Sequence, residues 1–332
     1  MAEYKGIQGY SVEYLEADPP AAKAVGRLWY NDSGSGAFKI GTSASGSWSS
    51  GGALNTGRGQ FGLTGIVTAA VAFGGSPSQK NNTEQYDGTT WTAKNTLNTG
   101  TQYNVGFGTS TAATNTGGVV SGGADTGVTE SWDGTNWTTS PGTLNTARQK
   151  MSASNQAPST TGIIFGGYKQ SPNTSVNNTE EWNGSAWSEK SGDLNTAREA
   201  GGGGGTATAA FIAGGNIYSP SSLQNLTELW NGTSWTASNP LNTSRQGTGS
   251  SGTTTSALVY GGTTGSPTAV TEQWDGTSWT EVGDLATAAE GKGKGCGVSG
   301  DSALAAGFDG SPNTITEEWT SPIYTIKTVT VS

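Results

Sequence analysis

The residues of this chain that could carry out chemistry are few, and most of them recur at regular intervals. One glutamate follows a threonine in each of six repeated segments: Glu84, Glu130, Glu180, Glu228, Glu272 and Glu317. Glycoside hydrolysis needs two carboxylates facing a cleft, but a group that returns in every repeat is expected to be structural. Because an unpaired buried carboxylate is costly, we expect backbone N–H groups or nearby arginines to bind these glutamates.

Other catalytic groups are scarce. The 332 residues include no histidine, which excludes histidine-based metal sites and Ser-His or Cys-His catalysis. The single cysteine, Cys296, is expected to be a small buried residue. A run of five glycines at 201–205 lacks the Lys-Ser/Thr pair and the following helix of a phosphate-binding loop. We therefore predict no catalytic residue, no cofactor and no metal, and a protein that is not an enzyme.

The composition favours an all-β protein without nucleic-acid or membrane contacts. The chain has 54 glycines and 12 tryptophans but only 12% charged residues, a mixture that suits short strands and tight turns better than helices. Its net charge is −9, with only 16 basic residues to meet phosphates. It has no apolar run long enough to insert into a membrane. The N-terminus lacks the apolar stretch of a signal peptide.

Three sequence markers recur every 43 to 50 residues. A Leu-Asn-Thr triplet begins at Leu54, Leu97, Leu144, Leu194 and Leu241, and Leu285 begins a degenerate sixth copy. A short apolar run ending in a glycine pair follows, and then a Thr-Glu-x-Trp-Asp/Asn-Gly-x-x-Trp segment. The Asp-Gly or Asn-Gly pair predicts a hairpin with both aromatic rings on one face. Each repeat therefore supplies four strands.

Four-stranded repeats of this length predict a β-propeller. The first aromatic position is occupied six times, by Tyr86, Trp132, Trp182, Trp230, Trp274 and Trp319. No second tryptophan follows Trp319, but Trp48 precedes Leu54 by six residues, as Trp91 precedes Leu97. We therefore predict six blades and a ring closed by the strand around Trp48.

The markers resemble the kelch repeat over residues 42–320. The resemblance includes the glycine pair, the Glu-x-Tyr/Trp-Asp element, the second tryptophan and a linker arginine, present here as Arg58, Arg148, Arg198 and Arg245. Thr101 and Ala289 replace the arginine in two repeats, and the two aromatics are one residue closer than is usual in that family. The resemblance implies a kelch-type fold and no particular activity. We expect the arginines to fasten linkers; a ring that binds an acidic ligand is the alternative.

Residues outside the repeats are expected to form an attachment element. Residues 1–41 are predicted to be an N-terminal arm with a hairpin of 28–30 and 37–40, and 42–322 the propeller. Residues 323–332 are predicted to be an extra C-terminal strand that pairs with this hairpin or with a neighbouring subunit. The candidate residues for virion attachment or oligomerisation are Tyr4, Tyr10, Tyr14, Trp29 and Tyr30.

A Leu-Trp-Tyr-Asn hairpin that leads into such repeats is similar to proteins of marine bacteriophage virions. This resemblance implies a structural protein of the virion, assembled in the host cytoplasm. It would be a tail component (fibre, nozzle or baseplate-associated) that contacts other virion proteins and forms a homo-oligomer. The alternatives are a capsid-surface decoration protein, an intracellular kelch interaction module and a polysaccharide-acting enzyme.

The longest loops between the glycine pair and the Thr-Glu element, residues 168–178 and 216–226, are the candidate recognition loops. Insertions on one face of a repeat array often mark its binding face. The candidate recognition residues are Tyr168, Lys169, Gln170 and Tyr218. Their expected partner is a host-surface glycan, an envelope receptor or another virion protein.

Overall fold

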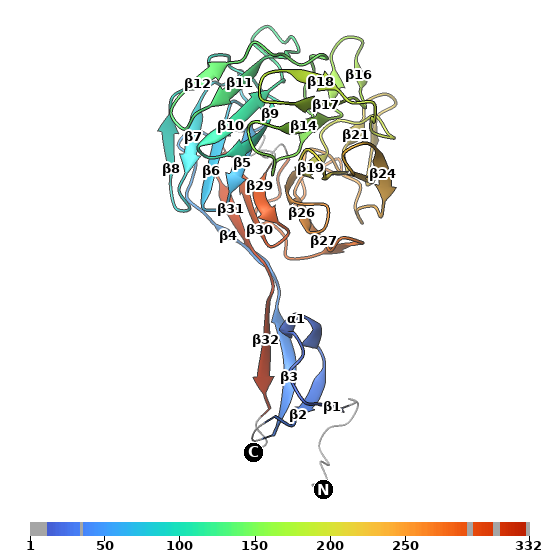
Figure 1. Cartoon of the computed structure of the whole chain (residues 1–332). Helices are drawn as coiled ribbons and strands as arrows, with labels where there is room; N and C mark the ends of the chain where they lie inside the picture. The colour runs from blue at the N-terminus through green and yellow to red at the C-terminus, as the bar shows by residue number, and fades with distance from the viewer. Residues whose placement is uncertain (1–11, 34–35, 291–294, 308–312, 330–332) are drawn as a thin grey trace. The chain divides into compact units, whose positions relative to one another are not determined.

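The computed structural model describes residues 12–33, 36–290, 295–307 and 313–329. The chain divides into two compact units, a smaller one of Met1–Gly46 with Ser321–Ser332 and a larger one of Ser47–Thr320 (Figure 1). The predicted boundaries after residues 41 and 322 lie close to these divisions. Each unit is built almost entirely from strands, so the prediction of an all-β protein is confirmed.

The described part of the larger unit contains six four-stranded antiparallel sheets. The first sheet contains β5 (Gly62–Ile66), β6 (Ala69–Phe73), β7 (Thr83–Tyr86) and β8 (Trp91–Lys94). The second contains β9 (Val105–Thr109), β10 (Ala112–Thr116), β11 (Thr129–Trp132) and β12 (Trp137–Thr139). The third contains β13 (Ser152–Ala153), β14 (Gly162–Phe165), β17 (Thr179–Trp182) and β18 (Trp187–Glu189).

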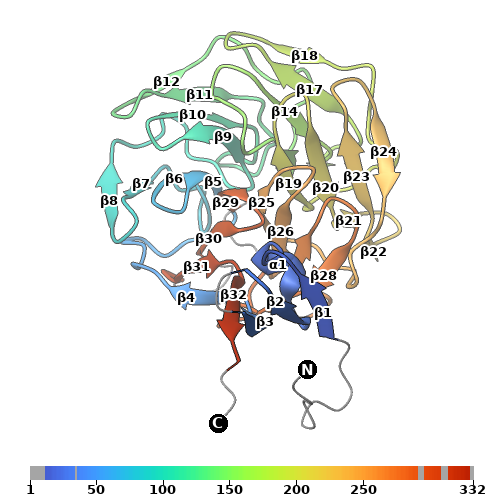
Figure 2. The same cartoon turned by 60° about the horizontal axis from the view of Figure 1, so that its bottom comes forward.

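The fourth sheet contains β19 (Gly202–Gly205), β20 (Ala210–Ala213), β23 (Thr227–Trp230) and β24 (Trp235–Ser238). The fifth contains β25 (Gly249–Gly252), β26 (Ala257–Tyr260), β27 (Thr271–Trp274) and β28 (Trp279–Glu281). The sixth contains β29 (Cys296–Ser299), β30 (Ser302–Ala306), β31 (Thr316–Thr320) and β4 (Ser47–Ser50). Figure 2 shows the sheets around a common centre, an arrangement consistent with a β-propeller.

The paired aromatic residues lie directly opposite each other in the hairpins, as their spacing predicts. Trp132 is the cross-strand partner of Trp137, and their ring centroids are 5.3 Å apart. In the sixth sheet, Trp319 of β31 faces Trp48 of β4, at 5.6 Å. The strand around Trp48 therefore completes the sheet formed by the last repeat.

Six hydrophobic clusters of described residues make up the core of the larger unit. Five join sheets that are consecutive in this order, and one joins the first sheet to the sixth. Phe73 of the first sheet packs edge-on against Trp137 of the second, with centroids 5.0 Å apart. Phe165 of the third packs in the same way on Trp235 of the fourth, at 4.7 Å. One cluster joins Trp91 of the first sheet to Leu304 of the sixth. Burying one large apolar side chain stabilises the fold by about 1.5–3 kcal/mol, so these interfaces contribute strongly to stability.

The smaller unit is a four-stranded sheet in the order β1-β2-β3-β32. Its elements are β1 (Val12–Leu15), the short helix α1 (Ala21–Ala24), β2 (Leu28–Asn31), β3 (Ala37–Ala44) and β32 (Ile323–Thr328). The predicted hairpin is confirmed as β2 and β3, and the C-terminal strand pairs with β3 of the same chain. A β-carbon on Gly41 would lie 2.0 Å from the Ala24 carbonyl oxygen, so only glycine lets α1 pack on β3.

Candidate recognition face

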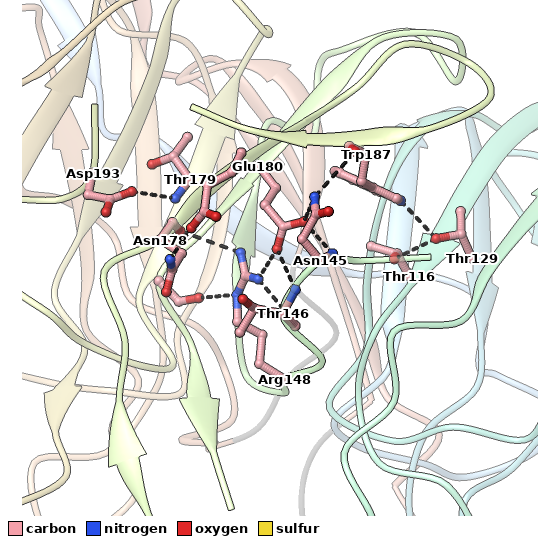
Figure 3. Close-up of polar contacts among 12 residues, drawn as sticks. Thr116, Thr129, Asn145, Thr146, Arg148, Asn178, Thr179, Glu180, Trp187 and Asp193 are labelled. Carbon is pink, nitrogen blue, oxygen red and sulfur yellow. Dashed lines mark hydrogen bonds and ion pairs between the residues drawn. The ribbon is translucent and has the colours of Figure 1, made fainter. Parts of the chain in front are cut away.

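The repeated glutamates bind the linkers between sheets, as Figure 3 shows for Glu180. Its carboxylate accepts hydrogen bonds from the N–H of Asn145 (2.7 Å), the Asn145 side-chain amide (2.9 Å) and the N–H of Thr146 (3.3 Å). It also pairs with the Arg148 guanidinium, and both side chains are fully buried. Burial lowers the pKa of Arg148, and the charge of Glu180 opposes that shift. We call this group of contacts the linker latch.

The linker latch recurs with small differences. The equivalent ion pairs are Arg58–Glu84 (3.2 Å), Arg198–Glu228 (2.7 Å) and Arg245–Glu272 (3.1 Å). The expectation that backbone amides and linker arginines bind the glutamates is confirmed. All four arginines are buried and paired with glutamates, and Arg58, Arg148 and Arg245 also donate to main-chain carbonyls. They therefore form no exposed ring for an acidic ligand.

Two latches lack the arginine, at the positions of Thr101 and Ala289. Glu130 of the second sheet is fully buried and accepts three hydrogen bonds, from the N–H and side-chain amide of Asn98 and the N–H of Thr99, each 2.9 Å long. In the sixth sheet, Glu317 accepts the N–H of Ala286 at 2.7 Å. The amide contacts with the linker are thus the constant part of the latch.

A second repeated contact links neighbouring sheets through tryptophan and threonine. In each case the indole N–H of the outer tryptophan donates to the threonine hydroxyl that precedes a repeated glutamate in the sheet before it. The pairs are Trp137–Thr83, Trp187–Thr129, Trp235–Thr179, Trp279–Thr227, Trp48–Thr271 and Trp91–Thr316, at 2.8 to 3.0 Å. The last two pairs join the fifth sheet to the sixth and the sixth sheet to the first.

The remaining repeated acids support the hairpin turns. Asp133 accepts the N–H groups of Asn136 and Thr135 at 2.7 and 2.8 Å, and these bonds lower its pKa. Asp87 and Asp275 do the same in the first and fifth sheets. Among the described residues, no three His, Cys, Asp or Glu side chains are grouped so that they could hold a metal ion. Cys296 is buried as predicted, and burial raises the pKa of its thiol.

The two longest loops begin beside the linkers, at one end of the third and fourth sheets. Tyr168 bridges to Gln149, and Asn216 bridges to Glu199. The structure brings two of the predicted recognition residues together, because the rings of Tyr168 and Tyr218 lie 4.7 Å apart. Tyr168 is 8% exposed, whereas Tyr218 is 36% exposed. Burial raises the pKa of Tyr168 to about 12.

Lys150 lies beside this tyrosine pair and was not found from the sequence. Its ammonium is 5.3 Å from the ring centroid of Tyr103 and 5.2 Å from that of Tyr168, and it pairs with Glu199 at 3.4 Å. Glu199 is buried, and its second carboxylate oxygen has no hydrogen-bond partner among the described residues. The sequence spacing could not show that Tyr103, Tyr168 and Glu199 lie close to Lys150, because these residues come from three repeats.

A main-chain belt places Lys150 at this position. The residue two places after the linker arginine, or after its substitute, has a left-handed backbone in four repeats: Gln60, Tyr103, Lys150 and Ala200, with φ of 55° to 57°. The N–H of Tyr103 donates to Gln60, that of Lys150 to Tyr103, that of Ala200 to Lys150, and that of Gly247 to Ala200, at 2.7 to 3.0 Å. A left-handed non-glycine residue costs roughly 1–2 kcal/mol, and these bonds compensate for it.

Lys169 and Gln170, the other two predicted residues, line a surface hollow of about 580 Å³. The hollow lies between the 122–125 turn of the second sheet, the linker at 145–147 and residues 169–171 of the third sheet. Asp125 forms part of its wall, and both of its carboxylate oxygens accept hydrogen bonds, from the Gln149 side chain (2.8 Å) and the N–H of Gln170 (2.7 Å). Lys169 is half-buried and Gln170 is exposed.

The candidate attachment residues of the smaller unit differ in exposure. Tyr14 is 75% exposed, and Tyr30 lies between it and Phe38, with centroid distances of 5.1 and 5.2 Å. Trp29 is fully buried and donates its indole N–H to Asp18 at 2.9 Å, so its role in this structure is to form the core. Tyr4 and Tyr10 lie outside the described residues.

No protein-family model matches the chain, and no curated protein matches it. Across the part of the chain that the structure describes, no helix has the length and apolar character needed to cross a membrane.

Proposed function

We propose that the six sheets are the blades of a closed six-bladed propeller of kelch type, with β4 completing the last blade. Two independent sets of contacts support closure. The hydrophobic clusters join each sheet to the next and also the sixth to the first. The tryptophan–threonine bonds follow the same cyclic order.

We further propose that the chain is a non-enzymatic structural protein of a bacteriophage particle, and specifically a tail component of a fibre, nozzle or baseplate. The virion assignment rests on the similarity of residues 28–31 and the repeats to marine phage virion proteins. The observation that supports a structural and binding role is the use of the repeated carboxylates. All six bind linkers, whereas the non-repeated Lys150, Tyr168 and Tyr218 lie together beside the long loops.

In this proposal the two units divide the work. The larger unit displays the loops of 168–178 and 216–226 to a host-surface glycan, an envelope receptor or another virion protein. The smaller unit contains β1 and β32, and its exposed Tyr14 contacts other virion proteins or further copies of the chain.

Quantitative mass spectrometry of purified particles, with immunogold labelling, tests the virion assignment. We expect a fixed number of copies per particle and labelling at the tail. Labelling over the capsid surface would instead support a decoration protein. Absence from particles would contradict the proposal. Binding to one soluble cellular partner would then indicate an interaction module, and polysaccharide turnover an enzyme.

A further inference from the structure

The hollow between the second and third sheets has an unequal balance of charge. Asp125 is the acidic residue in its wall, and hydrogen bonds from Gln149 and Gln170 occupy both oxygens. Lys169 is the basic residue, and its ammonium makes no ion pair or hydrogen bond with the described residues. The chain as a whole has a net charge of −9. This hollow, in contrast, presents an unpaired ammonium and a carboxylate whose two oxygens are already hydrogen-bonded.

The size and walls of the hollow suit a sugar. A volume of about 580 Å³ lies within the usual range of small-ligand sites. Gly122 and Gly123 have positive φ, and a β-carbon on either would meet no heavy atom within 4 Å. The main chain of Gly122 and Gly123 therefore lies next to open space. Within this turn, the Gly123 N–H donates to the Val120 carbonyl and the Ala124 carbonyl accepts from the Val120 N–H.

Gln170 lines the hollow together with the cation, and an aromatic pair outside that lining begins at the preceding residue. Gln170 follows Lys169 and has an exposed side chain that can donate and accept hydrogen bonds. Tyr168 precedes Lys169 and contacts the more exposed ring of Tyr218. Aromatic rings with one polar end are common in binding surfaces because they offer an apolar face and a hydrogen-bonding group together.

We propose that this hollow binds an acidic carbohydrate, with a sugar carboxylate on the Lys169 ammonium and neighbouring hydroxyls on Gln170 and the main chain of Gly122 and Gly123. The inference rests on the proposed display of this loop face for recognition. A charge-assisted hydrogen bond to Lys169 supplies the preference for acidic over neutral sugars. Because Lys169 is only half-buried, salt weakens the interaction.

Isothermal titration calorimetry on the whole chain, with tri-galacturonic acid as the acidic probe, tests this proposal. Maltotriose is the neutral probe of equal length, and acetate tests whether a carboxylate alone is sufficient. We expect the acidic trisaccharide to bind at least about tenfold more tightly than either control. Equal binding of maltotriose, equal binding of acetate, or no binding of the acidic trisaccharide would overturn the proposal.

Two pairs of variants locate the site. Lys169→Glu should weaken binding by at least about tenfold, whereas Lys94→Glu, the same charge change at an exposed lysine of the first sheet, should not. Ala124→Trp should block the hollow, and Ala93→Trp, at another exposed alanine, should leave binding unchanged. Equal effects within either pair would place the binding elsewhere. Circular dichroism confirms that each variant is folded.

This test is separate from the test of the virion assignment. Acidic-sugar binding by a protein absent from particles would uphold the site and contradict the phage role. A chain present in particles that fails to bind the acidic trisaccharide would do the reverse.

Discussion

The linker latches differ in their chemistry from the loop face, by which we mean the loops of 168–178 and 216–226 with the adjacent Lys150. At the latches, Glu84, Glu180, Glu228 and Glu272 are buried, and each pairs with a linker arginine. At the loop face, Lys150, Lys169 and Tyr218 have no counterparts of the same type in the other repeats. The comparison indicates that the recurring residues maintain the scaffold, while positions whose residue type does not recur are available for recognition.

Removing a latch carboxylate should have the largest effect. Glu180→Ala leaves Arg148 buried without its partner, which should lower the free energy of unfolding by about 3–5 kcal/mol. The adjacent Glu181 provides the control, because its pair with Lys190 is partly exposed and Glu181→Ala should cost about 0–1 kcal/mol. Chemical denaturation of both variants checks this, and similar losses would show that the latch is not a stabilising contact.

The latches with and without arginine should respond differently to a neutral replacement. Glu180→Gln removes the charge that compensates Arg148, whereas Glu130→Gln removes no partner of a buried cation. We expect the second substitution to cost about 1–2 kcal/mol and the first about twice as much, as measured by denaturation. A larger loss for Glu130→Gln would contradict the role given to Arg148.

The Trp91–Thr316 hydrogen bond between the sixth and first sheets should contribute as much to stability as the equivalent hydrogen bonds between consecutive sheets. Thr316→Val and Thr179→Val each leave a buried indole N–H, of Trp91 and Trp235, without its acceptor. Each should cost about 1–3 kcal/mol. If Thr316→Val had no effect in denaturation while Thr179→Val did, the proposed ring would be open at that joint.

Buried tyrosines should make the fold sensitive to alkali. Burial raises the pKa of Tyr86 and of Tyr168 to about 12, from an ordinary value of 10.0. The unfolded chain therefore loses these protons first, and stability falls between about pH 10 and pH 12 by up to about 1.4 kcal/mol per pH unit for each tyrosine. Tyr86→Phe should flatten this slope in denaturation measured across that range. An unchanged slope would show that Tyr86 ionises equally in the folded and unfolded states.

At the loop face a substitution should change binding more than stability. Tyr218→Ala removes a ring that is 36% exposed and should alter the free energy of unfolding by no more than about 0.5–1 kcal/mol. It should still reduce adsorption of particles to host cells if the face is used for recognition. If particles carrying a folded Tyr218→Ala variant adsorbed as well as the wild type, Tyr218 would have no role in recognition.

Much of the scaffold could be predicted from the sequence because its signals are local. The Asp-Gly spacing that places Trp132 opposite Trp137 lies within nine residues, and the distance from Trp48 to Leu54 identified the strand that pairs with β31. The glutamate partners followed from the cost of burying an unpaired carboxylate. The parallel pairing of β1 with β2 was not predicted, since residues 12–15 carry no repeat signal.

The details of the candidate site could not be predicted because they arise between repeats. Lys150 reaches Tyr103 and Glu199 only because a belt of main-chain bonds holds these segments together. The donation from Trp137 to Thr83 likewise depends on the offset between two sheets. Single-repeat patterns carry no information about either arrangement.

A cysteine cross-link between β4 and β31 tests the proposed ring most directly. Ser47 and Thr320 are exposed cross-strand partners, a separation that suits a disulfide, and the natural Cys296 is buried. Oxidised Ser47→Cys/Thr320→Cys protein should form an intramolecular bond, seen as a gel shift, and unfold at a higher temperature. Ser47→Cys/Ser188→Cys, with its second cysteine on the third sheet, should not cross-link within the chain. Only intermolecular dimers from the first variant, or no cross-link, would contradict closure by β4.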